Sequence, residues 1–286
     1  MSHSAQQTHL HGHGHGDHGH GDHGHSHDAD LAEMIDLDAE VLHQHNEEVI
    51  AWVAALAPAR SRIIDVGAGT GVASLALARQ LPDAEVVAVD VDEAMLARIR
   101  HKAEAAGVAS RIRTVQADLD QPWPPLGPAD LVWAANSLHH VADPGDALAQ
   151  AHAVLRARGV LAVSEMDHFP RFLPDAGGAA LEERVHAAMA DRRTEAGLHM
   201  DEDWGARLAQ AGFTVETRRA FGVSLSSPLP AGAGRYAQVT LQRWRHGLED
   251  RLDEADLAAL DAAAASAPER NDLIIRAART VWIGRR

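Results

Sequence analysis

The chain of 286 residues contains no cysteine. This absence excludes disulfide bonds, thiolate metal sites, iron–sulfur clusters and cysteine nucleophiles. Aromatic residues are also scarce, with one Tyr and four Phe, so we expect no extended aromatic cage. Long hydrophobic runs are missing as well: no stretch approaches the ~20 apolar residues of a membrane helix, and the first residues lack the apolar core of a secretory signal. We therefore expect a cytoplasmic protein that is not bound to a membrane.

Basic residues are in the minority. The chain has 26 Lys and Arg against 41 Asp and Glu, which gives a formal net charge of -15. A negative field repels a phosphate backbone, so nucleic acid is not an expected partner. The hydrophobic fraction of 46% is ample for a core. A chain of this length is typical of one α/β domain with an insertion or a lid.

The N-terminal segment, residues 1–30, is rich in histidine, glycine and aspartate. Ten of the twenty histidines lie between His3 and His27. A segment with so few apolar side chains does not offset its ordering entropy, so we expect it to be disordered. Imidazoles on a flexible chain bind Ni(II), Zn(II) or Cu(II), although a functionally silent extension remains the alternative. The candidate metal ligands are His11, His13, His15, His18, His20, His23, His25 and His27.

Folded structure is expected from Leu31 onward, in one domain over residues 31–286. The run Leu37–Ala57 predicts one amphipathic helix. After it, short apolar strands alternate with helices five times, which is typical of a parallel sheet covered on both faces. The expected strands are Arg62–Val66, Glu85–Val89, Arg111–Val115, Leu131–Ala135, Gly159–Ser164, Phe213–Arg219 and Thr280–Ile283.

A glycine-rich loop follows the first strand. It reads Asp65-Val66-Gly67-Ala68-Gly69-Thr70-Gly71 and opens the next helix. Glycines permit positive backbone angles and let a ligand approach the main chain closely, and helix amides favour a negative group. In open α/β sheets the ligand crevice lies at this strand end. The loop therefore predicts a ligand site that includes Ala68.

Three kinds of ligand loop can be compared with this segment. A dinucleotide fingerprint requires a sixth-position glycine where Val72 stands, and a phosphate loop requires a lysine that is missing. The remaining pattern, D-x-G-x-G-x-G, resembles the first motif of the class I methyltransferases. Asp90, which ends the second strand about one crossover unit later, is placed to accept ribose hydroxyls of either cofactor type.

The resemblance covers roughly Ile63 to Ser164 and implies S-adenosylmethionine as cofactor. It implies a doubly wound, mostly parallel seven-stranded sheet with helical lid insertions. Asp90 and Val91 would bind the ribose, Asp118 and Leu119 the adenine, and Asn136 the methionine end. The cofactor half would comprise residues 61–165, and the acceptor and lid half residues 166–286.

The exit of the fourth strand is expected to face the methyl acceptor. It lacks the N-P-P-Y or D-P-P-Y motif of the DNA and glutamine amino-methyltransferases, and its L-H-H-V pattern is similar to the ubiquinone and menaquinone type. His139 and His140 are candidate general bases, because histidine accepts a proton near neutral pH. Glu165, Asp167 and His168 follow the fifth strand, and a metal site from His139, Asp167 and His168 is a further hypothesis without a supporting spacing rule.

Three segments are expected to form the acceptor lid: Met166–Met200, Asp38–Leu56 and Arg235–Arg251. Trp204 and Trp244 are candidates for lining the acceptor pocket. The sequence thus predicts transfer of a methyl group from S-adenosylmethionine to an O, N or C atom of a small molecule. The alternatives are an NAD-dependent oxidoreductase and a metal-handling protein whose domain only senses the cofactor.

Overall fold

A computed structural model describes residues 23–200 and 202–286, with side chains described from Asp30 onward except Asp201. One seven-stranded sheet has the order β3-β2-β1-β4-β5-β7-β6, and β7 runs antiparallel to both of its neighbours. The predicted doubly wound, mostly parallel sheet is therefore confirmed. The strands are β1 (Arg62–Val66), β2 (Glu85–Asp90), β3 (Ile112–Gln116), β4 (Ala129–Ala135), β5 (Leu155–Arg171), β6 (Thr214–Leu225) and β7 (Ile275–Arg285).

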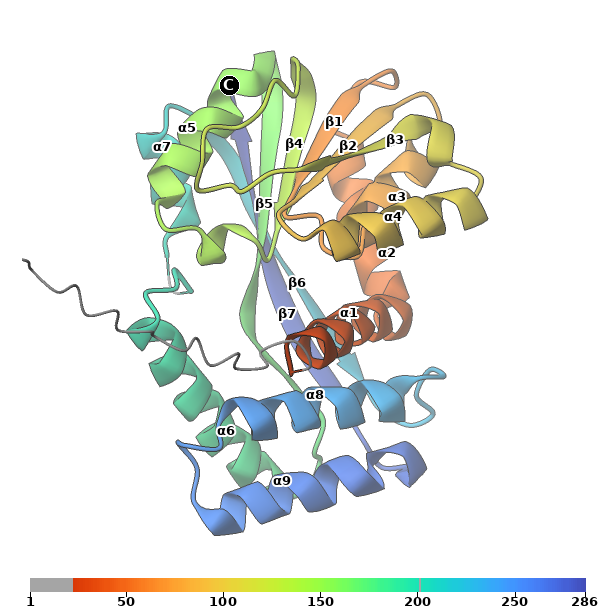
Figure 1. Cartoon of the computed structure of the whole chain (residues 1–286), viewed down its shortest axis with the longest axis vertical. Coiled ribbons are helices and arrows are strands. Elements are labelled where there is room, and N and C mark those ends of the chain that lie inside the picture. The colour runs from red at the N-terminus through yellow and green to blue at the C-terminus, as the bar shows by residue number, and fades with distance from the viewer. Residues whose placement is uncertain (1–22, 201) are drawn as a thin grey trace, which may run out of the picture.

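Helices cover both faces of the sheet (Figure 1). Successive side chains of a strand point to opposite faces, so Ile63 packs with α2, α3 and α4, while Ile64 packs with α5 and α7. Both isoleucines are fully buried, which is why β1 reads as a continuous apolar run. These five helices are α2 (His43–Ala54), α3 (Val72–Gln80), α4 (Glu93–Ala105), α5 (Pro144–Val154) and α7 (Trp204–Gln210).

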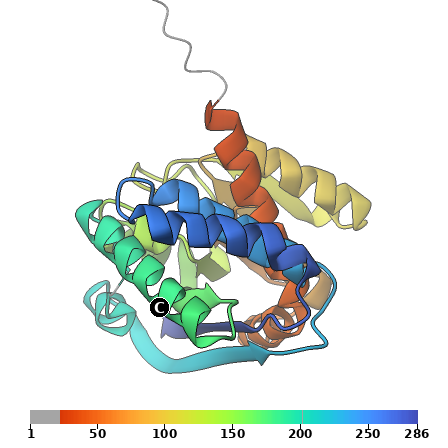
Figure 2. The ribbon, with the colours of Figure 1, turned by 90° about the horizontal axis from the view of Figure 1, so that it is seen from below.

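A second helical layer lies across the carboxyl ends of the parallel strands (Figures 1 and 2). It has its own apolar cluster, in which Phe172, Tyr236, Leu241 and Leu260 are buried. Because β5, β6 and β7 are long, they connect this layer to the sheet. The layer consists of α1 (His23–Val41), α6 (Ala176–Glu195), α8 (Ala233–Gly247) and α9 (Glu254–Ser266).

The N-terminal helices differ from the expectation in two ways. The helix expected over Leu37–Ala57 is wrong as a single element: it is divided between α1 and α2 at Leu42, whose φ of -98° and ψ of 24° are not helical. The division has a packing cause, since Val41 and Leu42 are buried in the second layer whereas Val49 is buried against the sheet. Also, α1 begins at His23 rather than near Leu31, and extending a packed helix costs much less than nucleating one.

The candidate metal ligands His11, His13, His15, His18 and His20 lie outside the described residues, and the side chains of His23, His25 and His27 are not described. The described helices include none that is both long and apolar enough to cross a membrane.

Candidate active site

The glycine loop turns sharply between β1 and α3. Gly67, Gly69 and Gly71 all have positive φ, at 67°, 52° and 81°. A Cβ on Gly67 would lie 2.3 Å from Cβ of Ser137, and a Cβ on Gly71 would lie 2.7 Å from Ile99. Gly67 is thus required by the approach of the β4 exit, and Gly71 by the packing of α4. Gly71 does not line the cavity described below, unlike Gly67, Ala68 and Gly69.

The carboxylate of Asp90 is held at the end of β2. Its Oδ2 accepts a hydrogen bond from the Gly69 amide at 2.7 Å, and its Oδ1 accepts one from the Asp92 amide at 3.0 Å. Asp92 itself caps α4 by accepting from the Ala94 amide, so Asp90 is not needed as the helix cap. The two amides fix the plane of the Asp90 carboxylate beside the glycine loop, and Val91 next to it is 61% exposed.

The exits of β3 and β4 supply the next predicted residues. Asp118 accepts a hydrogen bond from the Asp120 amide at 2.9 Å, which orients its carboxylate at the cavity beside Leu119. Asn136 has a positive φ of 51°, unusual for a residue other than glycine, and its amide donates to the Ser164 carbonyl at 2.8 Å. Its side-chain Oδ1 is buried and has no hydrogen-bond partner among the described residues. A strained residue with an unpaired buried oxygen is typical of a ligand site.

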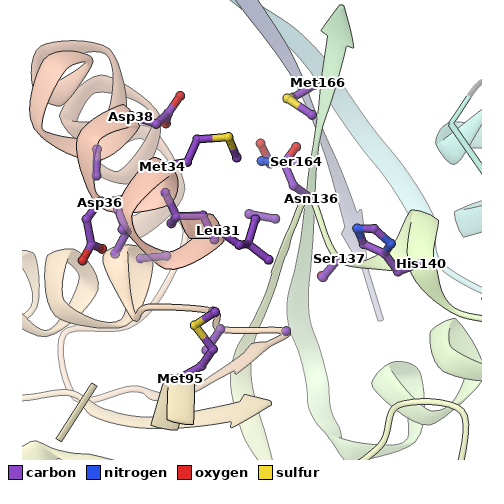
Figure 3. A pocket seen from close by; sticks show the side chains of 18 of the residues that line it. Leu31, Met34, Asp36, Asp38, Met95, Asn136, Ser137, His140, Ser164 and Met166 are labelled. Carbon is purple, nitrogen blue, oxygen red and sulfur yellow. The ribbon is translucent and has the colours of Figure 1, made fainter. Parts of the chain in front are cut away.

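One cavity of about 1930 Å³ connects these residues to the second helical layer. Figure 3 shows Leu31 and Met34 of α1 facing Asn136 and Ser164 across it. The volume exceeds the roughly 300–1,000 Å³ of a single-ligand pocket, so the cavity has room for a cofactor and an acceptor together. Among the predicted cofactor and base residues, the structure brings these to its wall: Asp65, Gly67, Ala68, Gly69, Asp90, Val91, Asp118, Leu119, Asn136, His139 and His140.

Asp65 is the buried acid of the glycine loop. It is 2% exposed, and its Oδ2 accepts a hydrogen bond from the Ser74 hydroxyl at 2.6 Å. Burial is the main cause that raises the pKa of Asp65; hydrogen bonds from Ser74 oppose it, the negative charge of Asp90 adds to it, and the net pKa is about 7. A cationic ligand near this pair of carboxylates would therefore be favoured.

His139 forms a buried dyad with Glu165. Its Nδ1 lies 2.6 Å from Oε2 of Glu165, and the two residues are 2% and 4% exposed. A carboxylate at Nδ1 fixes the tautomer in which the proton is on Nδ1, which leaves Nε2 as the proton acceptor. His139 is also one of the residues that line the cavity. This arrangement suits a histidine that acts as a base.

His140 stands beside His139, with ring centroids 4.1 Å apart, and its side chain is open to the cavity (Figure 3). The side chain is exposed but partly desolvated, and this loss of hydration, together with His139 and Arg193, lowers the pKa of His140 to about 4. A histidine with so low a pKa is neutral at physiological pH and is a weak proton acceptor.

Several hypotheses about the acceptor side are wrong. Trp204 is 1% exposed in the core between α7 and the sheet, whereas Trp244 does line the cavity. The metal site from His139, Asp167 and His168 is not formed: Asp167 accepts from the Thr280 hydroxyl, and the described residues include no group of three His, Cys, Asp or Glu placed to hold a metal.

Sequence reasoning missed a polar cluster on the cavity wall. Asp38 of α1 accepts a hydrogen bond from the Tyr236 hydroxyl at 2.8 Å and forms an ion pair with Arg279 at 2.5 Å. Arg279 also donates to Asn46 at 2.7 Å. These residues come from α1, α2, α8 and β7, so no local motif in the sequence indicated them.

Comparison with known proteins places this geometry in a family. Residues 63–159 match the model of a methyltransferase domain. A demethylmenaquinone methyltransferase of Thermus thermophilus is 35% identical over 175 residues, 56% of this chain and 78% of that protein. A 27-O-demethylrifamycin SV methyltransferase of Amycolatopsis mediterranei is 30% identical over 185 residues, 64% of this chain and 65% of that protein. The chain spans from 28% to 78% of the length of the curated relatives it matches.

The chain belongs to the class I S-adenosylmethionine-dependent methyltransferases. The predicted S-adenosylmethionine-dependent methyltransferase is therefore confirmed. The alternative of an NAD-dependent oxidoreductase is set aside. Among solved structures, the [4+2]-cyclase SpnF has a TM-score of 0.52 at 21% identity and is matched over 84% of this chain and 80% of that one. That likeness concerns the fold alone, and the reaction must be argued from the site.

The raised pKa of Asp65 predicts a pH dependence of stability. In the unfolded chain the Asp65 carboxyl loses its proton above the ordinary pKa of 3.8, whereas in the folded chain it keeps the proton up to about pH 7. Unfolding therefore becomes easier as pH rises through this window, by roughly 2–3 kcal/mol between pH 5 and pH 8. Asparagine cannot titrate, so Asp65→Asn lacks this effect. The stability of the variant minus that of the wild type should therefore be larger at pH 8 than at pH 5, by the same amount. Urea unfolding of both proteins measures it, with the exposed Asp83→Asn as control, and parallel pH profiles would contradict the assignment.

Proposed function

We propose that the enzyme transfers the methyl group to an O, N or C atom of a small-molecule acceptor bound in the same cavity as the cofactor. The observation that carries this proposal is the continuity of one cavity from the glycine loop to the His139–Glu165 dyad. The known acceptors of relatives support it, since the names of two of them describe methylation of demethylmenaquinone and of 27-O-demethylrifamycin SV. Both are small molecules.

The residues of the cavity fit S-adenosylmethionine. The tight cradle at Gly67, which has no space for a Cβ, lets a ligand approach the main chain. Asp90, held by two amides, would bind the ribose hydroxyls, with Val91 packing beside it. Asp118 and Leu119 would hold the adenine, and the unpaired Oδ1 of Asn136 would accept from the methionine ammonium.

The cofactor supplies an activated methyl group on a sulfonium. The chain must therefore align the acceptor with the S–CH₃ bond and exclude water. When the nucleophile carries a proton, Nε2 of His139 would accept that proton as the nucleophile takes the methyl group that the bound cofactor would supply. Glu165 then stabilises the imidazolium through Nδ1. His140, with its pKa near 4, is a weaker candidate for this role.

We further propose that the N-terminal segment binds a divalent metal such as Ni(II), Zn(II) or Cu(II). Its ten histidines between His3 and His27 support this, because neutral imidazole is a ligand of all three ions. Nothing in the methyl-transfer site needs that metal, so the segment would act as an accessory to the enzyme.

The cofactor assignment can be tested by calorimetric titration of S-adenosylmethionine. Asp90→Ala removes the acceptor of two ribose hydrogen bonds, so the affinity should fall about tenfold or more. Asp83→Ala removes a charge of the same sign from an exposed position outside the cavity and should bind like the wild type. Equal affinities of Asp90→Ala and wild type would show that the cofactor is held elsewhere.

The base can be tested with tritiated S-adenosylmethionine and a panel of phenols of graded acidity. For phenols that are protonated at the assay pH, His139→Gln should lower kcat by about 100-fold, and Glu165→Gln should lower it by about tenfold or more. For phenols already ionised at that pH the loss should vanish, since no proton has to be removed. A uniform loss across the panel would instead assign His139 a structural role. The exposed His101→Gln on α4 is the control.

The metal proposal is tested with a variant of residues 1–286 in which serine replaces the ten histidines from His3 to His27. This variant should lose tight Ni(II) binding in calorimetry but keep the wild-type affinity for S-adenosylmethionine and its methyl-transfer rate. Retained Ni(II) affinity would refute the assignment of the tail. Simultaneous loss of methyl transfer would favour the alternative in which metal handling is the main function.

A further inference from the structure

The carboxylates and the arginines on the cavity wall come largely from different parts of the sequence. Among the residues whose side chains are described, the ten carboxylates that line the cavity lie between Asp30 and Asp120, on α1, on α2 and in the proposed cofactor half. From Met166 to Leu248, the described lining residues include Arg192, Arg193 and Arg243 and no carboxylate. Arg79 and Lys102 line the cavity from the cofactor half, so the stretch from Met166 to Leu248 is distinguished by having arginines without carboxylates.

Arg193 is the arginine of this wall whose described contacts are apolar or weakly polar. Its guanidinium carbon lies 4.2 Å from the centroid of the Phe169 ring, and its Nη1 donates to Sδ of Met200 at 3.4 Å. These described contacts are an aromatic face and a thioether rather than a carboxylate. Burial lowers the pKa of Arg193 to about 10, against the opposing effect of Glu165. The guanidinium is therefore still charged at neutral pH, although it has lost much of its hydration.

The position of Arg193 relates it to the proposed base. Hydrogen bonds link Arg193 to the proposed base: its Nη1 donates to Sδ of Met200, and the amide of His199, the residue before Met200, donates to the His139 carbonyl at 3.0 Å. The charge of Arg193 also contributes to the lowered pKa of His140. Glu165 is already hydrogen-bonded to His139 and does not form an ion pair with Arg193. A half-buried guanidinium with its fork of N–H donors is suited to one further oxyanion.

We propose that the methyl acceptor is an acidic small molecule, and that Arg193 binds its oxyanion while the atom to be methylated lies at His139. A carboxylate and a phosphate share the geometry that the guanidinium fork recognises. Apolar side chains of the same part of the chain line the cavity with Arg193, namely Met166, Phe169, Met189, Leu198 and Trp244, and Phe169 contacts its guanidinium. The acceptor therefore has an apolar body with the acidic group close to the methylated atom. Arg193 is a residue that determines specificity rather than one that transfers a proton.

This inference rests on the proposed function, so the binding of the cofactor product is measured first, which separates a failure of one from a failure of the other. Protein saturated with S-adenosylhomocysteine is titrated with matched probes: salicylate against salicylamide, 4-hydroxybenzoate against 4-hydroxybenzamide, and phenyl phosphate against phenol. Each pair differs in its oxyanion and keeps the apolar ring. Failure of the protein to bind S-adenosylhomocysteine would overturn the proposed function, whatever the probes do.

With cofactor product bound, the acidic member of at least one pair should bind about tenfold tighter than its neutral partner. The carboxylate pairs and the phosphate pair then identify the preferred oxyanion. Equal affinity of acid and neutral partner in all pairs, or no binding of any acid, would overturn the proposal. This comparison uses the wild-type protein and is independent of how any variant folds.

Variants assign the preference to Arg193. Arg193→Met keeps an extended side chain without the charge. Its affinity for the acidic probe should fall to its affinity for the neutral partner. Arg193→Lys keeps the charge without the fork and should retain part of the preference. Arg218→Met removes an exposed arginine of β6 and should leave it intact. Unchanged affinity for S-adenosylhomocysteine shows that each variant is folded, and an acid preference that persists in Arg193→Met would refute the assignment.

Discussion

The ion pair between Asp38 and Arg279 holds the two layers of this enzyme in register. Burial opposes the charge of Arg279, yet Asp38 raises the pKa of Arg279, so the guanidinium stays charged inside the cavity wall. Tyr236 donates to the same carboxylate and brings α8 into the cluster. Removing one partner of such a pair leaves an uncompensated buried charge, which is strongly unfavourable. The position of α1 over the sheet therefore depends on a few polar atoms at the rim of the site.

The same helix is fixed at the cofactor side. Asp36, two residues before Asp38, accepts hydrogen bonds from the Thr70 hydroxyl at 2.6 Å and from Lys102 at 2.5 Å. Lys102 also donates to the carbonyl of Thr70. One turn of α1 thus connects the glycine loop to the acceptor layer, and the helix forms the wall between the outside and the proposed methyl-transfer position. Any ligand that displaces α1 must break contacts with both halves, which couples the two binding events energetically.

The sequence predicted the parts of the site that depend on local geometry. Gly67 and Asp90 stand at the carboxyl ends of neighbouring parallel strands, and a parallel sheet must bring such ends to one edge. The division at Leu42 and the burial of Trp204 could not be predicted, because they depend on which of two cores a side chain meets. Arg193 was missed for the same reason: within α6 it resembles any helix-terminal arginine, and only the packing of the second layer brings it to the cavity wall.

The division of charge within the cavity explains how one negatively charged protein can hold ligands of opposite sign. A sulfonium cofactor is favoured by Asp65 and Asp90, whereas an acidic acceptor approaches against the field of the whole chain. That field is screened over about 8 Å at physiological salt, so it affects the encounter more than the bound state. Inside, the low-polarity surroundings strengthen the attraction of Arg193 for an oxyanion. The carboxylates of the cofactor half and the arginines between Met166 and Leu248 line one cavity together with His139, so each ligand is favoured at a different part of the same wall.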